Sequence, residues 1–196
     1  MKIGVQSAPI MDELGVEEGF RTLRACGIES VDYNIDHELS GNDILAGRRS
    51  GIFYRSEKEV MDFYAPARKA AERHGIGIHQ VHAPFPCYVK DADAQESLMQ
   101  ALSMSVAATH ALGATHIIVH PAYLAYAEGL TPEQEWAINR ALYLGLAPAL
   151  RKYNVTCCLE NMFTKHRARV MASVCADPHD AVRYIDDLND LAQDKL

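Results

Sequence analysis

Basic residues are scarce in this chain of 196 residues. It has 19 Lys and Arg against 26 Asp and Glu, which gives a net charge of −7 at pH 7. A surface that binds nucleic acid needs clustered Lys and Arg to neutralise phosphates. The densest basic stretch, TKHRAR at 164–169, is short. The sequence therefore disfavours nucleic acid as a partner.

Long apolar runs are also missing. Although 48% of the residues are hydrophobic, no run approaches the ~20 residues that a membrane-spanning helix needs. The N-terminal segment reaches acidic residues at Asp12 and lacks the apolar core of a signal peptide. We therefore expect a cytoplasmic protein with no membrane partner.

The five cysteines include no CxxC pair, and their number is odd. Cys157 and Cys158 are adjacent in an apolar run. Neighbouring residues of a strand point to opposite faces, so these two are poor disulfide partners for each other. We expect reduced thiols, as in cytosolic proteins.

Three motifs with known chemistry are absent: GxGxxG, GxxxxGK[ST] and GxSxG. The first two cradle phosphates at a helix N-terminus, and the third presents a nucleophilic serine. The sequence therefore gives no support for nucleotide binding of these types or for serine-hydrolase chemistry.

What the sequence does contain is a repeat. Four times, a helical pattern ends at Gly27, Gly75, Gly113 or Asn154, and a short run rich in apolar residues follows at once. Gly and Asn suit the left-handed conformation that ends a helix. The short runs suit strands that are covered on both faces, as in a parallel sheet. Residues 2–6 supply one more strand.

Helices are predicted in the gaps, over residues 16–26, 56–74, 93–112, 131–153 and 177–192. Ser56 with Glu59 three positions later forms a capping-box pattern. Thr131 suits an N-cap, with Pro132 at the first helical position. Pro148 is expected to kink or split its helix, because proline lacks the N–H that an interior helical residue donates.

Alternating strands and helices predict an α/β fold with a parallel sheet and right-handed crossovers. We expect a single domain over residues 1–196. Two architectures compete: an open doubly wound sheet, and part of a (βα)8 barrel, which typically needs ~250 residues. A flavodoxin-like sheet requires the strand order to reverse, whereas sequential neighbours indicate the barrel.

Polar residues stand where the predicted strands end: Asp32 and Asn34, His82, His120, and Glu160 followed by Asn161. His82 and His120 each lie seven positions after their helix-ending glycine, and Glu160 lies six after its asparagine. We therefore expect these three at nearly the same height, at the carboxyl edge of the sheet. Two imidazoles and a carboxylate are ligands that zinc or manganese accepts.

Each residue of this set has a plainer interpretation when it is taken alone. A histidine after a strand usually forms a hydrogen bond with a loop. Glu160 alone would serve as an ion-pair partner or a helix cap. The co-registered set of three is harder to explain in this way, and from spacing alone both interpretations stay open.

Five stretches together resemble the xylose isomerase-like TIM-barrel superfamily: KIGVQSA (2–8), CGIESVDYN (26–34), VHAP (81–84), IIVHP (117–121) and CLENM (158–162). This superfamily includes sugar isomerases and epimerases and DNA-repair enzymes of the endonuclease IV type. The resemblance covers essentially the whole chain. It implies about five of the eight βα units of a TIM barrel, with parallel strands in sequential order.

The resemblance also implies roles for individual residues. Glu160 matches a glutamate that binds a divalent metal (Mn, Zn, Co or Mg) and acts as an acid or base. His82 and His120 match zinc ligands of the endonuclease branch, and residues that line the substrate pocket in isomerase branches. Asn34 and Asn161 are expected to contact substrate.

The implied activity is isomerisation or epimerisation of a sugar or sugar phosphate, by proton transfer next to a carbonyl through an enediolate. Two alternatives stay open. One is a non-catalytic remnant or metal-binding module, and the other is an endonuclease IV-like zinc phosphodiesterase.

The sequence departs from the superfamily in one respect. The remaining metal ligands of such barrels, an Asp, a His and a Glu, lie near the ends of strands six to eight, and this sequence ends about where strand six is expected. We therefore expect a barrel that is truncated before strand six. Whether this chain is active by itself, and whether it holds a metal by itself, stays open. Unpaired edges on strands one and five predict a homodimer or higher oligomer.

Overall fold

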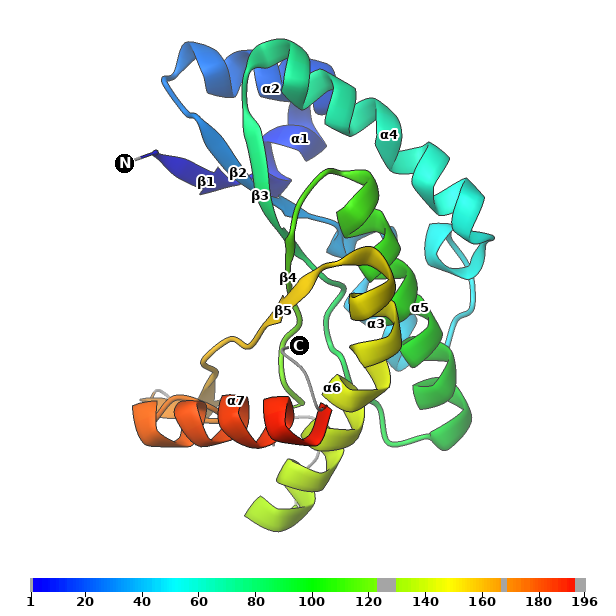
Figure 1. Cartoon of the computed structure of the whole chain (residues 1–196), viewed down its shortest axis with the longest axis vertical. Helices are drawn as coiled ribbons and strands as arrows, with labels where there is room; N and C mark the ends of the chain where they lie inside the picture. The colour runs from blue at the N-terminus through cyan, green and yellow to red at the C-terminus, as the bar shows by residue number, and fades with distance from the viewer. Residues whose placement is uncertain (1, 123–129, 167–168, 193–196) are drawn as a thin grey trace.

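The computed structural model describes residues 2–122, 130–166 and 169–192. Its centre is a five-stranded parallel sheet in the order β1-β2-β3-β4-β5 (Figure 1). The strands are β1 (Gly4–Gln6), β2 (Ser30–Asn34), β3 (Gly77–His82), β4 (His116–Ile118) and β5 (Thr156–Cys158). The order is sequential, which confirms the barrel segment and excludes the flavodoxin-like alternative.

The helices follow the strands. They are α1 (Ala8–Leu14), α2 (Val16–Ala25), α3 (Gly41–Leu45), α4 (Glu57–His74), α5 (Ala92–Ala111), α6 (Pro132–Tyr153) and α7 (Pro178–Ala192), with short 3-10 turns η1 (Asp36–Glu38) and η2 (Ile52–Tyr54). Helices α4, α5 and α6 lie side by side along one side of the sheet (Figure 1). This is the arrangement of the outer helices of a barrel. None of the helices in the described ranges is long and apolar enough to cross a membrane.

The helix ends confirm the sequence prediction. Gly27, Gly75, Gly113 and Asn154 have φ angles of 78°, 65°, 79° and 53°, in the left-handed region that glycine and asparagine adopt most readily. Capping boxes begin α4 and α6, the first of them at Ser56 as expected. Local sequence chemistry therefore sets where these strands begin.

Pro148 does not split α6, which continues through this residue, and a kink there stays a prediction. Leu142, Leu146 and Leu150 recur every four residues and are each at most 3% exposed. Their burial offsets the one backbone hydrogen bond that proline cannot donate, at roughly 25 cal/mol for each Å² of apolar surface buried.

The core lies between the helices and one face of the sheet. Val31, Val81 and Ile117 each come from a different strand and are at most 1% exposed. Neighbouring strand residues point the other way, and there His116 and Thr156 are exposed. The face of the sheet that lacks helices is therefore open, and it is the face that carries the polar strand ends.

A two-stranded antiparallel sheet, β6 (Phe163–His166) with β7 (Arg169–Ala172), follows β5. The sequence pattern did not predict this sheet. The basic stretch at 164–169 falls here, and its residues 167 and 168 lie outside the described ranges.

Candidate metal centre

His82 is the last residue of β3. Its neighbour Val81 is fully buried against the helices, so His82 points to the open face of the sheet. Its side chain is 16% exposed. The strand therefore delivers a largely buried imidazole to the carboxyl edge.

Asp32 of β2 fixes the orientation of this ring. Its Oδ2 atom lies 2.7 Å from Nδ1 of His82. An ionised carboxylate only accepts hydrogen bonds, so Nδ1 carries the proton that is donated to Asp32. The Nε2 atom of His82 is thereby turned away from β2, towards the strands that follow.

His120 lies two residues beyond β4, in a segment that α6 holds in place. The hydroxyl of Tyr143 donates to the carbonyl of Val119 over 2.9 Å. The side-chain amide of Asn139 accepts from the N–H of Ala122 over 2.8 Å and donates to its carbonyl over 3.0 Å. Both side chains are at most 1% exposed, so the backbone on each side of His120 is anchored in the core.

The imidazole of His120 is also held by neighbouring rings. Its centroid lies 4.8 Å from that of Phe85 and 5.3 Å from that of His82, with both pairs edge-on. Edge-on contacts are a preferred geometry for aromatic pairs. The two imidazoles therefore approach each other at a fixed angle.

Glu160 lies two residues beyond β5, where the chain still runs beside the segment that follows β4. The N–H of Val119 donates to the carbonyl of Cys158 over 3.3 Å, which extends the pairing towards Glu160. The glutamate side chain is 40% exposed. It is the member of the set that reaches solvent most readily.

The three side chains converge. The Oε2 atom of Glu160 lies 2.6 Å from Nε2 of His120 and 3.3 Å from Nε2 of His82. All three atoms lie within 4.8 Å of one another, and within the described ranges this is the group of His, Cys, Asp and Glu side chains that is arranged to hold a metal ion. The structure thus brings together the three residues that spacing singled out.

The register differs in one respect from the expected equal height. Ile118 of β4 pairs with Cys158 of β5, so His120 and Glu160, each two residues further on, lie level with each other. On its other side Ile118 pairs with His82 of β3. His82 is therefore two residues behind the other two. Strands of a barrel are tilted and staggered, so a side chain that lags in the ladder still reaches the same point.

The surroundings of the cluster shift the pKa values of the two imidazoles in opposite directions. Burial lowers the pKa of His82, but the hydrogen bond and charge of Asp32, joined by those of Glu160, raise it by more. Burial is also the largest influence on His120, and together with the charge of His82 it outweighs Glu160, so the pKa of His120 is lowered. His82 therefore keeps its proton to higher pH than a free imidazole does, and His120 loses its proton at lower pH.

The donor set fits a divalent metal of the zinc type. Three protein ligands with imidazole nitrogen and carboxylate oxygen, leaving one position open, are typical of catalytic zinc sites. Ligand atoms around a tetrahedral zinc lie roughly 3.3 Å apart. The His82 and Glu160 atoms have this separation, and the 2.6 Å contact between His120 and Glu160 would have to lengthen for both side chains to bind one ion. The carboxylate of Asp32 behind His82 is the partner that metal-binding histidines usually have.

Of the two asparagines of the predicted site, Asn34 pairs with His82 in the strand ladder. Asn34 is 6% exposed, and its Oδ1 atom accepts a hydrogen bond from the N–H of Asp36 over 2.8 Å. Its own N–H donates to the hydroxyl of Ser7. Asn34 therefore shapes the turn after β2. Asn161 follows Glu160 and is exposed, and substrate contact by either residue stays a prediction.

Three residues position the two histidines of the cluster but were not predicted to do so from the sequence. Asp32 was visible at a strand end, and alternation along β2 places it on the open face. Asn139 and Tyr143 gave no local signal, because a polar residue within a helix usually faces solvent. Their role depends on which segment packs against α6.

Comparison with known proteins identifies the fold family. The model of the xylose isomerase-like TIM barrel family matches residues 20–193. The chain belongs to this family. No curated protein sequence matches it significantly.

Solved structures of related fold include epimerases and an endonuclease. The first is a 3-keto-D-glucoside 4-epimerase from E. coli, with 14% identity and a TM-score of 0.67 over 96% of this chain and 65% of that chain. The second is a D-psicose 3-epimerase determined in the presence of D-fructose, with 15% identity and a TM-score of 0.62 over 96% of this chain and 60% of that chain. The third is an AP endonuclease, family 2, from Brucella melitensis, with 12% identity and a TM-score of 0.66 over 96% of this chain and 65% of that chain. At such identities the similarity shows the fold alone. The chain spans 60–65% of the length of these structures.

Proposed function

We propose that the chain carries the metal-binding wall of a xylose isomerase-like barrel that transfers a proton next to the carbonyl of a sugar or sugar phosphate. The observation that carries this proposal is the convergence of His82, His120 and Glu160 on one point at the carboxyl edge of the sheet. Active sites of TIM barrels lie at this edge. The epimerases among the structures of related fold support the reaction class.

The three converging side chains would hold the metal. When bound, a divalent ion supplies Lewis acidity, which polarises a carbonyl oxygen and an adjacent hydroxyl and so lowers the cost of forming an enediolate. Asp32 keeps the proton of His82 on Nδ1, so that Nε2 presents a lone pair to the site.

Glu160 would also act as the base. Its carboxylate is the most exposed of the three side chains, so a substrate on the open face of the sheet reaches it. It takes the proton from the carbon next to the carbonyl, and the electrons of the C–H bond form the C=C bond of the enediolate. Return of a proton to the other face of that carbon gives the epimer, and return to the neighbouring carbon gives the isomer.

Exchange of hydrogen with solvent tests this proposal directly. The chain is incubated with Mn²⁺ or Zn²⁺ and D-fructose in D₂O, and deuterium next to the carbonyl is measured by NMR. We expect incorporation above the background of the metal alone, and loss of it in Glu160→Gln with the fold retained by circular dichroism. Glu133→Gln, an exposed glutamate on α6, is the matched control and should leave exchange unchanged. Equal exchange by the Glu160→Gln variant would rule out the assigned role.

A second candidate function, zinc phosphodiesterase activity of the endonuclease type, is favoured by the donor set itself. His82 and His120 match the zinc ligands that the family resemblance implies for that branch, and the nearby carboxylate of Glu160 is a further ligand that zinc accepts. The net charge of −7 opposes it, because gripping DNA requires positive charge. Cleavage of a duplex with an abasic site, lost in His120→Ala, would favour this candidate over the isomerase.

Metal binding without either activity would indicate a non-catalytic metal-binding module. Calorimetric titration with Zn²⁺ distinguishes such a module from a chain that binds no metal. One equivalent of zinc is expected for the wild-type chain and for His179→Ala, an exposed histidine on α7. Loss of binding is expected for His120→Ala.

A further inference from the structure

The imidazole of His120 meets one polar side chain within the described ranges, that of Glu160 at Nε2. Glu160 belongs to the candidate metal centre, so this contact lies on the metal side of the ring. His82 is different, because Asp32 accepts a hydrogen bond from its far nitrogen, Nδ1. Metal-binding histidines usually have such a partner. Another contact is therefore needed to fix the plane of the His120 imidazole.

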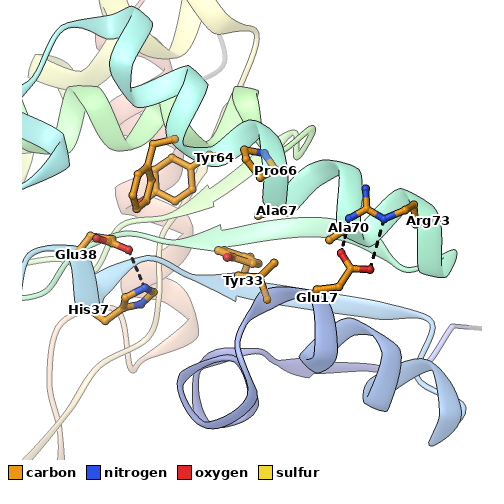
Figure 2. A pocket seen from close by; sticks show the side chains of 11 residues that line it. Glu17, Tyr33, His37, Glu38, Tyr64, Pro66, Ala67, Ala70 and Arg73 are labelled. Atoms are coloured by element: carbon orange, nitrogen blue, oxygen red, sulfur yellow. Dashed lines mark hydrogen bonds and ion pairs between the residues drawn. The ribbon is translucent and has the colours of Figure 1, made fainter.

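Carboxylates hold other histidines of this chain, as Asp32 holds His82. The Nε2 atom of His37 lies 3.0 Å from a carboxylate oxygen of Glu38 (Figure 2), and Nε2 of His74 lies 2.8 Å from one of Glu17. The surroundings of His120 thus depart from the arrangement that the chain uses elsewhere.

The ring of Phe85 supplies the missing contact. Its centroid lies 4.8 Å from that of His120, and the two ring planes meet at 84°. Edge-on contacts are a geometry that aromatic pairs prefer, so turning the imidazole out of this arrangement costs free energy. Phe85 is half-buried and the side chain of His120 is 19% exposed. The contact is therefore largely shielded from water.

The backbone that carries Phe85 is tied to the backbone of His120 through a buried thiol. Cys87 is 1% exposed, and its Sγ atom donates to the carbonyl of Pro84 over 3.3 Å. A hydrogen bond with the backbone of His120 lowers the pKa of the same thiol, against the larger upward effect of burial. The chain on either side of Phe85 is thus held at a fixed place relative to His120.

Helix α3 also packs against this segment. A Cβ atom at Gly41, the first residue of α3, would lie 3.0 Å from the carbonyl oxygen of Phe85 and 3.4 Å from Cδ of Pro86. The absence of a side chain at Gly41 therefore allows the helix to approach this closely. A residue that orients a functional side chain does so best when its own position is locked by packing.

We propose that Phe85 is a positioning residue, whose ring holds the imidazole of His120 in the plane in which Nε2 faces Glu160. The proposal rests on the function proposed above, because a fixed Nε2 matters for holding a metal ion. Fixing a ligand group in its bound orientation raises affinity, since less freedom is lost on binding. An edge-on aromatic contact contributes about 2–10-fold to such an equilibrium.

The mobility of the imidazole in the metal-free chain tests the positioning role directly. The order parameter of the His120 ring is measured by ¹³C relaxation in the wild type, in Phe85→Leu and in Phe85→Tyr. We expect it to fall in Phe85→Leu, which fills space but has no aromatic edge, and to be kept in Phe85→Tyr. His82 is the internal control, because Asp32 holds its ring, and its order parameter should stay unchanged.

Calorimetric titration with Zn²⁺ measures the consequence for metal binding. Phe85→Leu, with its fold checked by circular dichroism, should bind zinc about 2–10-fold more weakly, and Phe85→Tyr should bind it like the wild type. Phe63→Leu is the matched control. Phe63 also makes an edge-on contact, with Tyr64 at 5.0 Å, but it lies on α4, so its replacement should leave zinc affinity unchanged.

Two results would overturn the proposal. One is a His120 ring that is as rigid in Phe85→Leu as in the wild type, and the other is a folded Phe85→Leu variant that binds zinc as tightly as the wild type. Failure of the wild-type chain to bind zinc would instead contradict the proposed function. The metal-free measurement would then still decide whether Phe85 positions His120.

Discussion

The Oδ2 atom of Asp32 lies 2.7 Å from Nδ1 of His82, and this contact decides which imidazole nitrogen faces Glu160. Without it, the ring of His82 would be free to rotate and to carry its proton on either nitrogen. The carboxylate of Asp32 on β2 thus orients the imidazole of His82 on β3 towards the metal site.

Replacement of Asp32 tests this relationship. We expect Asp32→Asn to weaken Zn²⁺ binding by about 10–100-fold, the usual cost of losing the partner of a metal-binding histidine. Calorimetric titration of the folded variant measures the loss. Asp62→Asn, which removes an exposed carboxylate on α4, should bind zinc like the wild type. Unchanged affinity in Asp32→Asn would show that His82 is oriented by other contacts.

Zinc affinity should also depend on pH through His82. Its pKa is raised, chiefly because the hydrogen bond and charge of Asp32 outweigh burial. The metal must displace the proton on Nε2, so affinity falls as pH falls through this raised pKa. In Asp32→Asn the upward influence is lost, and the onset of the fall should move to lower pH. Titrations across a pH series measure both curves, and coincident onsets would contradict the assignment.

The sequence predicted the parts of the fold that local chemistry controls. Gly75 and Gly113 end their helices because a left-handed residue is needed there. Counting from them predicted that His82 and His120 lie together at the carboxyl edge of the sheet, and the structure brings them together with His82 two residues behind in the ladder. The role of Asp32 depends on how β2 pairs with β3, and the roles of Asn139 and Tyr143 depend on how α6 packs. Those relationships join residues far apart in the chain, so periodicity and spacing did not indicate them.

Asn139 offers a test of that long-range packing. Its amide satisfies both backbone groups of Ala122, and it is fully buried. Asn139→Ala leaves those groups unpaired and should lower the free energy of unfolding by about 1–3 kcal/mol. It should also weaken zinc binding, since His120 lies two residues away. Urea denaturation measures the first effect, with Asn42→Ala on α3 as a control of the same type.

A second copy of the chain is the partner that we expect at the free edge of β5. Within the described ranges β5 pairs with β4 alone, and α7 exposes Val182 (57%) and Ile185 (46%) nearby. A cavity of about 490 Å³ separates the helix from this strand, lined in part by Ile185 and Leu159. Unpaired edges beside apolar surface favour association.

Light scattering at micromolar concentration checks this expectation. Val182→Asp should convert the dimer into monomer, because it places a charge in the contact, whereas Leu45→Asp on α3, also exposed, should not. A monodisperse wild-type monomer would contradict the prediction.

Thiol reactivity should separate the exposed cysteine from the buried ones. Cys26 is exposed at the end of α2, whereas Cys87 and Cys175 are at most 3% exposed. Burial raises the pKa of the Cys87 thiol to about 12 and that of Cys175 to about 11. Because the thiolate is the reactive form, native protein in mildly alkaline buffer should show one fast reaction with Ellman's reagent. Cys26→Ser should remove that phase, and denaturation should expose the remaining thiols. A fast phase that survives in Cys26→Ser would mean that the half-buried Cys158 or one of the buried thiols is reached by solvent in the native state.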